Sequence, residues 1–402
     1  MGQVCAVNGH RNDPKNFRFV AIVAGEASAD LHGSNLVKAM KCLDPDIAFW
    51  GIGGQKMERA GVKIFVSASD MAVVGVTEVL CRFHTIVRAV RKLKSLLKTN
   101  PPDLLILIDY PEFNLYIARI AKRFHVPVLY YISPQVWAWR VGRIRKIARR
   151  VDRMAVILPF EKEFYMKRGM QVDYVGHPVL DCGAASGHHR DTIGFKETRS
   201  HECRNAESVI KCPVIGLVPG SRTEEIRNLL PVMVDAVDNL KRHYGSVRCV
   251  LPLAHTIDPG FVQPFIRDAS VDIEVLQGGI HEALDGCDMA FVTSGTATLE
   301  TAIMEIPMVI VYKVSRVSYW VGKNVIKVPF IGLVNLVAGE KIVTELIQDK
   351  AVPESLADEA LRILENDAVR ESMKKKLSAV KESLGRGGAS EKTARIALEM
   401  MR

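Results

Sequence analysis

The chain has 402 residues, 48% of them hydrophobic, which is enough to bury two ordinary domain cores. Its net charge of +9 favours an anionic partner: nucleic acid, an acidic membrane surface or a phosphorylated substrate. No stretch approaches the roughly 20 apolar residues of a membrane span, and the polar segment 1–16 lacks the apolar core of a secretory signal. The eight cysteines form no CxxC pair, so we expect a reduced, cytoplasmic protein that touches membranes only from that side.

Strands and helices are predicted to alternate after a flexible tail at residues 1–16. Short apolar runs predict strands, and amphipathic stretches between them predict helices. The strands expected in the first half are residues 17–24, 48–54, 104–108, 126–132, 154–158 and 173–175. The helices expected between them are residues 31–41, 55–60, 82–98 and 114–124. This alternation predicts a doubly wound parallel sheet in an N-terminal domain spanning 17–180.

The polar stretch 181–213 interrupts the pattern and is predicted to be a linker. A second alternation follows, which predicts another Rossmann-like domain at 214–384. Its expected strands are residues 214–218, 248–253, 273–276, 290–292 and 308–311, and its expected helices are 229–243, 297–304, 356–364 and 368–384. A last helix, within 385–402, could pack back on the N-terminal domain. Two such α/β domains facing each other would leave an interdomain cleft at the carboxyl ends of both sheets.

Two groups of polar residues follow predicted strands of the first domain. Residues 25–30 (GEASAD) place a glycine in a tight turn, and Glu26 and Asp30 would bring carboxylates to the cleft; a simple capping turn is the alternative. Asp109 ends the apolar strand 104–108, where a carboxylate has a raised pKa unless it is paired. It is therefore a candidate general base, although it could instead cap the next helix or pair with a lysine.

The second domain offers two anion-binding groups. Arg222 lies just past the strand 214–218 and beside a glycine, where it could bind phosphate through two hydrogen bonds or be an ordinary surface arginine. Ser294, Gly295 and Thr296 turn the chain into a helix, whose N-terminal N–H groups suit a phosphate or diphosphate. Glu300 lies one turn further, within reach of ribose hydroxyls. The alternative is an ordinary N-cap made by Ser294 or Thr296.

Basic and apolar residues are mixed in several segments. Residues 82–98 and 140–153 have the spacing of amphipathic basic helices, and 314–336 mixes aromatic and basic residues as an interfacial segment does. Residues 71–80 form a further apolar stretch, fit for acyl-chain contact or for the core. Solvated helix faces and a buried loop are the alternatives. The cysteines and histidines of the linker match no zinc spacing, so no metal site is predicted.

A set of motifs in fixed order resembles the lipid-A-disaccharide synthase family, the glycosyltransferases of lipid A assembly. The resemblance runs from about residue 19 to residue 348. Its motifs include AGEASAD (24–30), IDYPEFN (108–114), SPQVWAWR (133–140), LPFEKEFY (158–165), PGSRTEEI (219–226) and TSGTATLE (293–300). Ala29 departs from the family pattern, which usually has glycine there, and 183–212 has no family pattern.

The resemblance implies a GT-B fold and an inverting reaction that needs no metal or other cofactor. UDP-2,3-diacylglucosamine would be joined to 2,3-diacylglucosamine 1-phosphate to give a β-1,6-linked disaccharide 1-phosphate and UDP. Asp109 would be the base, with Glu26 as the second candidate. Further substrate-binding roles fall to Ser28 and Asn335 at the sugars, Arg222, Ser294, Gly295 and Thr296 at the diphosphate, Glu300 at the ribose, and Gln348 in closing the nucleotide site.

Because both substrates carry acyl chains, the resemblance also implies peripheral contact with the anionic surface of the inner membrane, without nucleic acid. A homo-oligomer is possible. Two other readings stay open from the sequence. One is a UDP-N-acetylglucosamine epimerase, or a transferase acting on a soluble or polyprenyl acceptor, on the same fold. The other is a basic membrane-surface or nucleic-acid-binding protein without catalysis.

Overall fold

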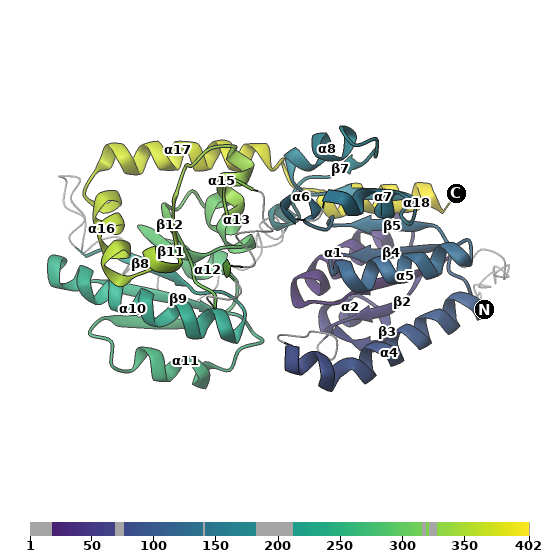
Figure 1. The fold of residues 1–402 in the computed structure, drawn as a ribbon, viewed down its shortest axis with the longest axis horizontal. Coiled ribbons are helices and arrows are strands. Elements are labelled where there is room, and N and C mark those ends of the chain that lie inside the picture. The colour runs from purple at the N-terminus through teal and green to yellow at the C-terminus, as the bar shows by residue number, and fades with distance from the viewer. Residues whose placement is uncertain are drawn as a thin grey trace, which may run out of the picture.

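Two parallel sheets organise the chain, each with helices packed around it (Figure 1). The computed structural model describes residues 18–68, 76–139, 141–181, 212–315, 319–320 and 328–401. The expected tail 1–16, nearly all of the expected linker, the apolar stretch 71–80, and residues 316–318 and 321–327 of the expected interfacial segment lie outside these residues or have undescribed side chains. Within the described part of the chain, no helix is both long and apolar enough to cross a membrane.

The first sheet has seven strands in the order β3-β2-β1-β4-β5-β6-β7. Its strands are β1 (Phe19–Ala24), β2 (Ala48–Gly53), β3 (Val62–Ser67), β4 (Leu104–Ile108), β5 (Val128–Tyr131), β6 (Arg153–Val156) and β7 (Asp173–Tyr174). The helices around it are α1 (Ala27–Leu43), α2 (Gln55–Arg59), α4 (Val76–Thr99), α5 (Pro111–Arg123), α6 (Val136–Trp139), η1 (Val141–Arg143), α7 (Ile144–Ala148) and α8 (Pro159–Met166).

The second sheet has six strands in the order β10-β9-β8-β11-β12-β13. They are β8 (Val214–Val218), β9 (Arg248–Leu253), β10 (Asp272–Gln277), β11 (Met289–Thr293), β12 (Met308–Tyr312) and β13 (Thr344–Ile347). The helices are α10 (Thr223–Tyr244), α11 (Pro259–Ile266), α12 (Ile280–Leu284), α13 (Thr296–Ile303), α15 (Leu333–Ala338), η3 (Gln348–Lys350), α16 (Pro353–Leu364) and α17 (Asp367–Ser383).

Both sheets repeat the strand order of a dinucleotide-binding fold. In each, the first strand lies between the second and the fourth. The order in which strands are added to the sheet therefore reverses between β1 and β4 and again between β8 and β11. The apolar sequences of these strands follow from burial on both faces; every residue of β4 and of β11 is buried. Ligands in such sheets bind outside the carboxyl ends of the strands at the reversal. The predicted doubly wound architecture is therefore confirmed.

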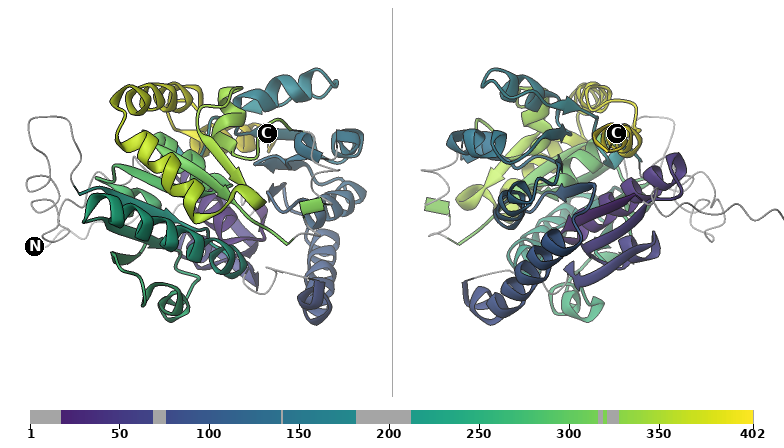
Figure 2. Two further views of the ribbon diagram at one scale, coloured as in Figure 1. Left: turned by 60° about the vertical axis from the view of Figure 1, so that its left-hand side comes forward. Right: turned by 90° about the vertical axis from the view of Figure 1, so that its right-hand side faces the viewer.

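The last helix, α18 (Ala389–Met400), lies on the first domain rather than the second. The chain leaves α17 and crosses over, and α18 packs against α1 (Figure 1, Figure 2). Asp181 fixes the crossing by accepting hydrogen bonds from the backbone N–H groups of residues 388–390 at 2.7–3.1 Å. Arg153 also pairs with Glu399 at 2.8 Å.

One predicted helix is wrong. The segment 140–153 was expected to be one basic helix, but its described residues, 141–153, form two short helices, η1 and α7, followed by the start of β6. Pairing between strands outweighs the helical pattern of the sequence here, because Arg153 pairs in register with Leu129 of β5. Val151, just before the strand, is buried in the core. Arg153 also binds Asp173, and Arg143 binds Glu112, so part of the basic charge is neutralised internally.

Candidate active site

Predicted site residues from the two domains meet at the carboxyl ends of the strands. Glu26 follows β1, Asp109 follows β4 and Arg222 follows β8, so all three lie at the points where the strand order reverses. Arg222 NH2 lies 3.8 Å from Glu26 Oε2 of the other domain, and its NH1 lies 3.8 Å from Glu225 Oε1. The contact between Arg222 and Glu26 joins the predicted base region to the predicted phosphate region.

Asp109, the candidate general base, has a raised pKa. Burial, and then the neighbouring carboxylate of Glu26, raise its pKa to about 6. The backbone N–H of Tyr110 and the guanidinium of Arg222 act in the opposite direction. A carboxylate with a pKa near 6 is ionised at neutral pH and is a stronger proton acceptor than an exposed one. Tyr110, and not Asp109, is the N-cap residue of α5, and no lysine is among the groups that shift the pKa of Asp109.

A glycine, Gly295, is the N-cap residue of α13. Gly295 precedes the helix with φ 148° and ψ −160°, a conformation essentially restricted to glycine, and no side chain caps the helix. Ser294 does not act as the cap, because its hydroxyl donates to the carbonyl of Ile331 at 2.9 Å. An uncapped N-terminus after a buried strand is the arrangement that binds phosphate groups.

Other predicted substrate-binding residues lie around these groups. Glu300, on α13, is partly buried, and this burial raises the pKa of its carboxyl group. Ser28 is exposed in the first turn of α1. The side-chain amide of Gln348 pairs with both backbone groups of Val314, at 2.7 and 2.9 Å, and so joins the end of β13 to the chain after β12.

Two residues, one expected to face the cleft and one expected at a sugar, are used inside the fold. Asp30 does not face the cleft: its carboxylate is buried and accepts hydrogen bonds from Gly54, Lys56 and Met57 N–H groups at 2.7–3.1 Å, which caps α2. Asn335 is completely buried, and its amide donates to Val343 O and Glu345 Oε1 while its oxygen accepts from the backbone at 342 and 343. With two donors and two acceptors used, its side chain has no capacity left for a sugar.

Glu161 forms a buried hydrogen-bond network that the sequence did not predict. It is 1% exposed and accepts hydrogen bonds from Ser133 Oγ at 2.5 Å and Trp137 Nε1 at 3.1 Å. Its second oxygen accepts from the backbone N–H groups of residues 157 and 158. The motifs SPQVWAWR and LPFEKEFY therefore meet at the buried carboxylate of Glu161. The signal in the sequence was a glutamate directly after Pro159 and Phe160, near the start of α8.

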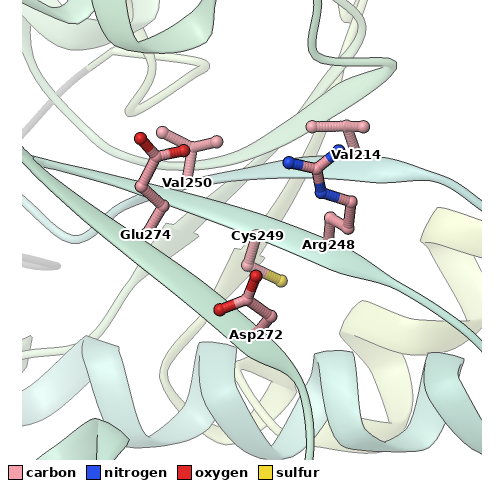
Figure 3. A pocket seen from close by; sticks show the side chains of 6 residues that line it. All are labelled: Val214, Arg248, Cys249, Val250, Asp272 and Glu274. Carbon is pink, nitrogen blue, oxygen red and sulfur yellow. The ribbon is translucent and has the colours of Figure 1, made fainter. Parts of the chain in front are cut away.

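A small pocket lies at the opposite end of the second sheet (Figure 3). It is lined by residues that include Val214, Arg248 and Asp272, which begin β8, β9 and β10. Its volume of about 10 Å³ holds about one water molecule, and it lies at the amino ends of the strands, away from Arg222. Among the described residues, no group of three or more His, Cys, Asp or Glu side chains is placed to bind a metal.

Solved structures with similar folds include UDP-N-acetylglucosamine 2-epimerases and a calicheamicin glycosyltransferase. The UDP-GlcNAc 2-epimerase from Neisseria meningitidis, solved with UDP-GlcNAc bound, is similar with a TM-score of 0.65 and 13% identity, covering 95% of this chain and 100% of that one. MurG from Acinetobacter baumannii is similar with a TM-score of 0.55 and 11% identity, covering 95% and 99%. At these identities the likeness concerns the fold, which is GT-B.

Sequence comparison separates the family from others of this fold. The family model for lipid-A-disaccharide synthetase matches residues 20–400. The lipid-A-disaccharide synthase of Geobacter metallireducens is 48% identical over 95% of this chain and 97% of its own length, and that of Coxiella burnetii is 40% identical over 94% and 97%. The chain belongs to the lipid-A-disaccharide synthase family and is a glycosyltransferase of lipid A biosynthesis.

Proposed function

We propose that this enzyme transfers 2,3-diacylglucosamine from UDP to the 6-hydroxyl of 2,3-diacylglucosamine 1-phosphate, with inversion to a β-1,6 linkage. The observation that carries the proposal is the meeting of Asp109 and Glu26 of one domain with Arg222 of the other. A proton acceptor on one side and a phosphate ligand on the other are the two groups that a sugar transfer from a nucleoside diphosphate requires.

The proposed reaction is a single displacement. Asp109 takes the proton of the acceptor hydroxyl as the oxygen attacks the anomeric carbon of the donor. The bond from that carbon to the diphosphate breaks on the opposite face, which inverts the configuration. Arg222 and the backbone N–H groups at Gly295 and Thr296 would stabilise the negative charge that develops on the leaving UDP.

Glu26 is the second candidate for the base, and it also occupies Arg222 before the donor binds. In the free enzyme its carboxylate lies beside Arg222. We infer that the donor diphosphate takes over this contact when it binds, because a diphosphate offers the guanidinium more charge and two-point hydrogen bonding. Glu26 would then be released toward the acceptor. The exposed Ser28, two residues further, is proposed to contact a sugar.

The nucleotide is proposed to lie on the second domain. Glu300 would bind the ribose, and Gln348 would hold the adjoining segment at Val314 in place. The similar fold of the Neisseria epimerase with UDP-GlcNAc bound supports a UDP-sugar on such a scaffold. We assign residues 214–384 to nucleotide binding and residues 17–180 to the acceptor.

The acceptor domain is also the proposed membrane contact. The described side chains of α4, from residue 84 to residue 99, contain no acidic residue, and five exposed basic residues lie there: Arg88, Arg91, Lys92, Lys94 and Lys98. A basic helix face is attracted to anionic lipid headgroups within about a Debye length. This supports a cytoplasmic enzyme bound peripherally to the inner membrane, where both acylated substrates reside.

The test is a substrate comparison in detergent micelles. The enzyme would receive radiolabelled 2,3-diacylglucosamine 1-phosphate with either UDP-2,3-diacylglucosamine or UDP-N-acetylglucosamine, and the product linkage would be read from the anomeric proton coupling. We expect a β-1,6 disaccharide from the diacylated donor only. Epimerised UDP-N-acetylglucosamine, transfer to a soluble acceptor or an α-linked product would contradict the proposal.

A further inference from the structure

The backbone directly after β4 has a conformation that side chains rarely adopt. The φ angle is 47° at Asp109 and 46° at Tyr110, so two successive residues other than glycine are left-handed. Aspartate visits this region more often than most residues, whereas a bulky tyrosine there is an outlier. Such residues persist only where the surrounding structure holds them, and they cluster at functional sites. The contacts that hold this pair therefore bear on the orientation of Asp109.

Two buried side chains hold the carbonyl group of Asp109. The hydroxyl of Tyr130, on β5, donates to Asp109 O at 2.5 Å. The amide of Asn114, on α5, donates to Asp109 O at 2.7 Å and to Ile108 O at 3.0 Å. Both side chains are completely buried. With the carbonyl fixed from two sides, the peptide after Asp109 cannot rotate without breaking buried hydrogen bonds.

Tyr110 is held separately. Its ring lies against Gly25 after β1, where an added Cβ would come within 2.6 Å of Tyr110 Cδ1. Pro111 follows, and a proline disfavours the right-handed helical conformation in the residue before it. Gly25, after β1, therefore leaves room for the ring of Tyr110, which holds the chain after β4 in place.

We propose that Tyr130 and Asn114 are positioning residues that aim the carboxylate of Asp109 at the place where Glu26 and Arg222 meet. They act through the Asp109 carbonyl and do not contact the substrate. This inference rests on the proposed role of Asp109 as the base. Small displacements of a reacting group have large effects on rate, so loss of either contact lowers turnover more than it lowers substrate binding.

The first test compares Tyr130→Phe with Tyr131→Phe. Both tyrosines are completely buried and adjacent on β5, but they point to opposite faces of the sheet and pack in different core clusters. We expect Tyr130→Phe to lower kcat by about tenfold or more with little change in KM for either substrate. Tyr131→Phe should match the wild type in kcat. A second variant, Asn114→Leu, keeps the branched side-chain shape but loses the donor without adding a charge, and should behave as Tyr130→Phe does.

A second measurement does not depend on activity. In protein labelled with carbon-13 at aspartate carboxyl groups, the Asp109 signal is the one lost in Asp109→Asn, and its titration reports the environment directly. In Tyr130→Phe the released carboxylate should hydrate, and its pKa should fall from about 6 toward the ordinary value. An unchanged titration and unchanged kcat in Tyr130→Phe would overturn the positioning role. A shifted titration in an enzyme that forms no disaccharide would retain that role and reject the proposed function.

Discussion

Glu26 Oε2 lies 3.8 Å from Arg222 NH2, although the two residues belong to different domains and are separated by almost half of the chain. Each follows the first strand of its own sheet, so equivalent positions in two similarly built domains face each other. Asp109 lies close enough to feel both charges: Glu26 raises its pKa, and Arg222 lowers it. The same three residues therefore couple the proposed base to the proposed phosphate ligand.

The two neighbours of Asp109 should shift the pH–rate profile in opposite directions. Because the ionised carboxylate is the active form, kcat/KM should fall about tenfold per pH unit below a pH near 6. Glu26→Gln removes a like charge, so the pKa of Asp109 and the acid limb should move to lower pH. Arg222→Gln removes the favourable cation, so the limb should move to higher pH. Identical limbs in wild type and both variants would show that another group titrates.

Arg222 should matter more for the donor than for the acceptor. We expect Arg222→Ala to raise KM for the UDP-sugar by about 10- to 100-fold, because a charge-assisted contact to the diphosphate is lost. Arg222→Lys should recover only part of this, since lysine cannot bind through two hydrogen bonds. Arg227→Ala is the matched control: Arg227 lies on α10, the helix that Arg222 precedes, is in an ion pair with Glu224, and its loss should leave the wild-type KM. Equal losses for Arg222 and Arg227 would place the diphosphate elsewhere.

Gly295 should be needed for its backbone and not for its size. An added Cβ would meet nothing within 4 Å, but φ is 148°. Gly295→Ala should therefore move the N-terminus of α13 and lower donor kcat/KM by about tenfold, equivalent to ~1.4 kcal/mol. Gly279→Ala is the control: it also precedes a helix and has open space, but its φ of −77° suits alanine. Donor kinetics that do not distinguish these two variants would argue against the α13 site.

Asp30 should affect stability and not turnover. Its carboxylate caps α2 through three backbone N–H groups, so Asp30→Asn should lower the free energy of unfolding by about 1–2 kcal/mol. Asp46→Asn, an exposed change at the amino end of β2, should have little effect on either. Thermal unfolding and kcat would be measured on the same samples. An unchanged melting temperature with a lower kcat in Asp30→Asn would instead indicate that Asp30 acts in the active site.

Two histidines, the buried His177 and the partly buried His32, should make the fold sensitive to acid. Burial lowers the pKa of His32 to about 4 and that of His177 to about 3, against an ordinary value of 6.5. Below pH 6.5 the unfolded chain binds protons that the folded protein does not, so stability should fall as pH drops from 6.5 toward 4. The slope is at most about 1.4 kcal/mol per pH unit for each histidine.

His177→Asn should flatten this slope, because asparagine does not titrate and its oxygen can accept the hydrogen bond from Val179 N–H. The control is His125→Asn, since His125 is exposed and its φ of 58° is one that asparagine tolerates. Urea unfolding across the pH range measures both variants. A slope that is unchanged in His177→Asn would assign the acid sensitivity to other groups.

Sequence patterns predicted the buried elements well and the edges poorly. Leu104–Ile108 and Val214–Val218 were predicted to the residue, because a strand buried on both faces is apolar throughout. β3 and β13 were missed because they are partly exposed and carry polar residues such as Lys63 and Glu345. The basic spacing of residues 140–153 predicted a helix, since helical periodicity does not reveal that a strand pairs at Arg153.

Site residues that follow buried strands were predicted, and those that depend on contacts distant in the sequence were not. Glu26, Asp109, Arg222 and Gly295 were predicted because each follows a buried strand, and the carboxyl ends of parallel strands share one edge. Asp30 was expected at the cleft and Asn335 at a sugar, but both are used inside the fold. The sequence does not reveal their hydrogen-bond partners, which lie 24 or more residues away for Asp30 and across a turn for Asn335. The contact of Tyr130 with the Asp109 carbonyl depends on a backbone conformation that no sequence spacing encodes.

The central claim is that Asp109 is the base for disaccharide formation. The most direct test measures disaccharide formed from UDP-2,3-diacylglucosamine and labelled 2,3-diacylglucosamine 1-phosphate, comparing wild type, Asp109→Asn and Asp46→Asn. We expect product from the wild type and from Asp46→Asn at similar rates, and a loss of about a hundredfold or more in Asp109→Asn. Product from Asp109→Asn at the wild-type rate would contradict the assignment and transfer the role of base to Glu26.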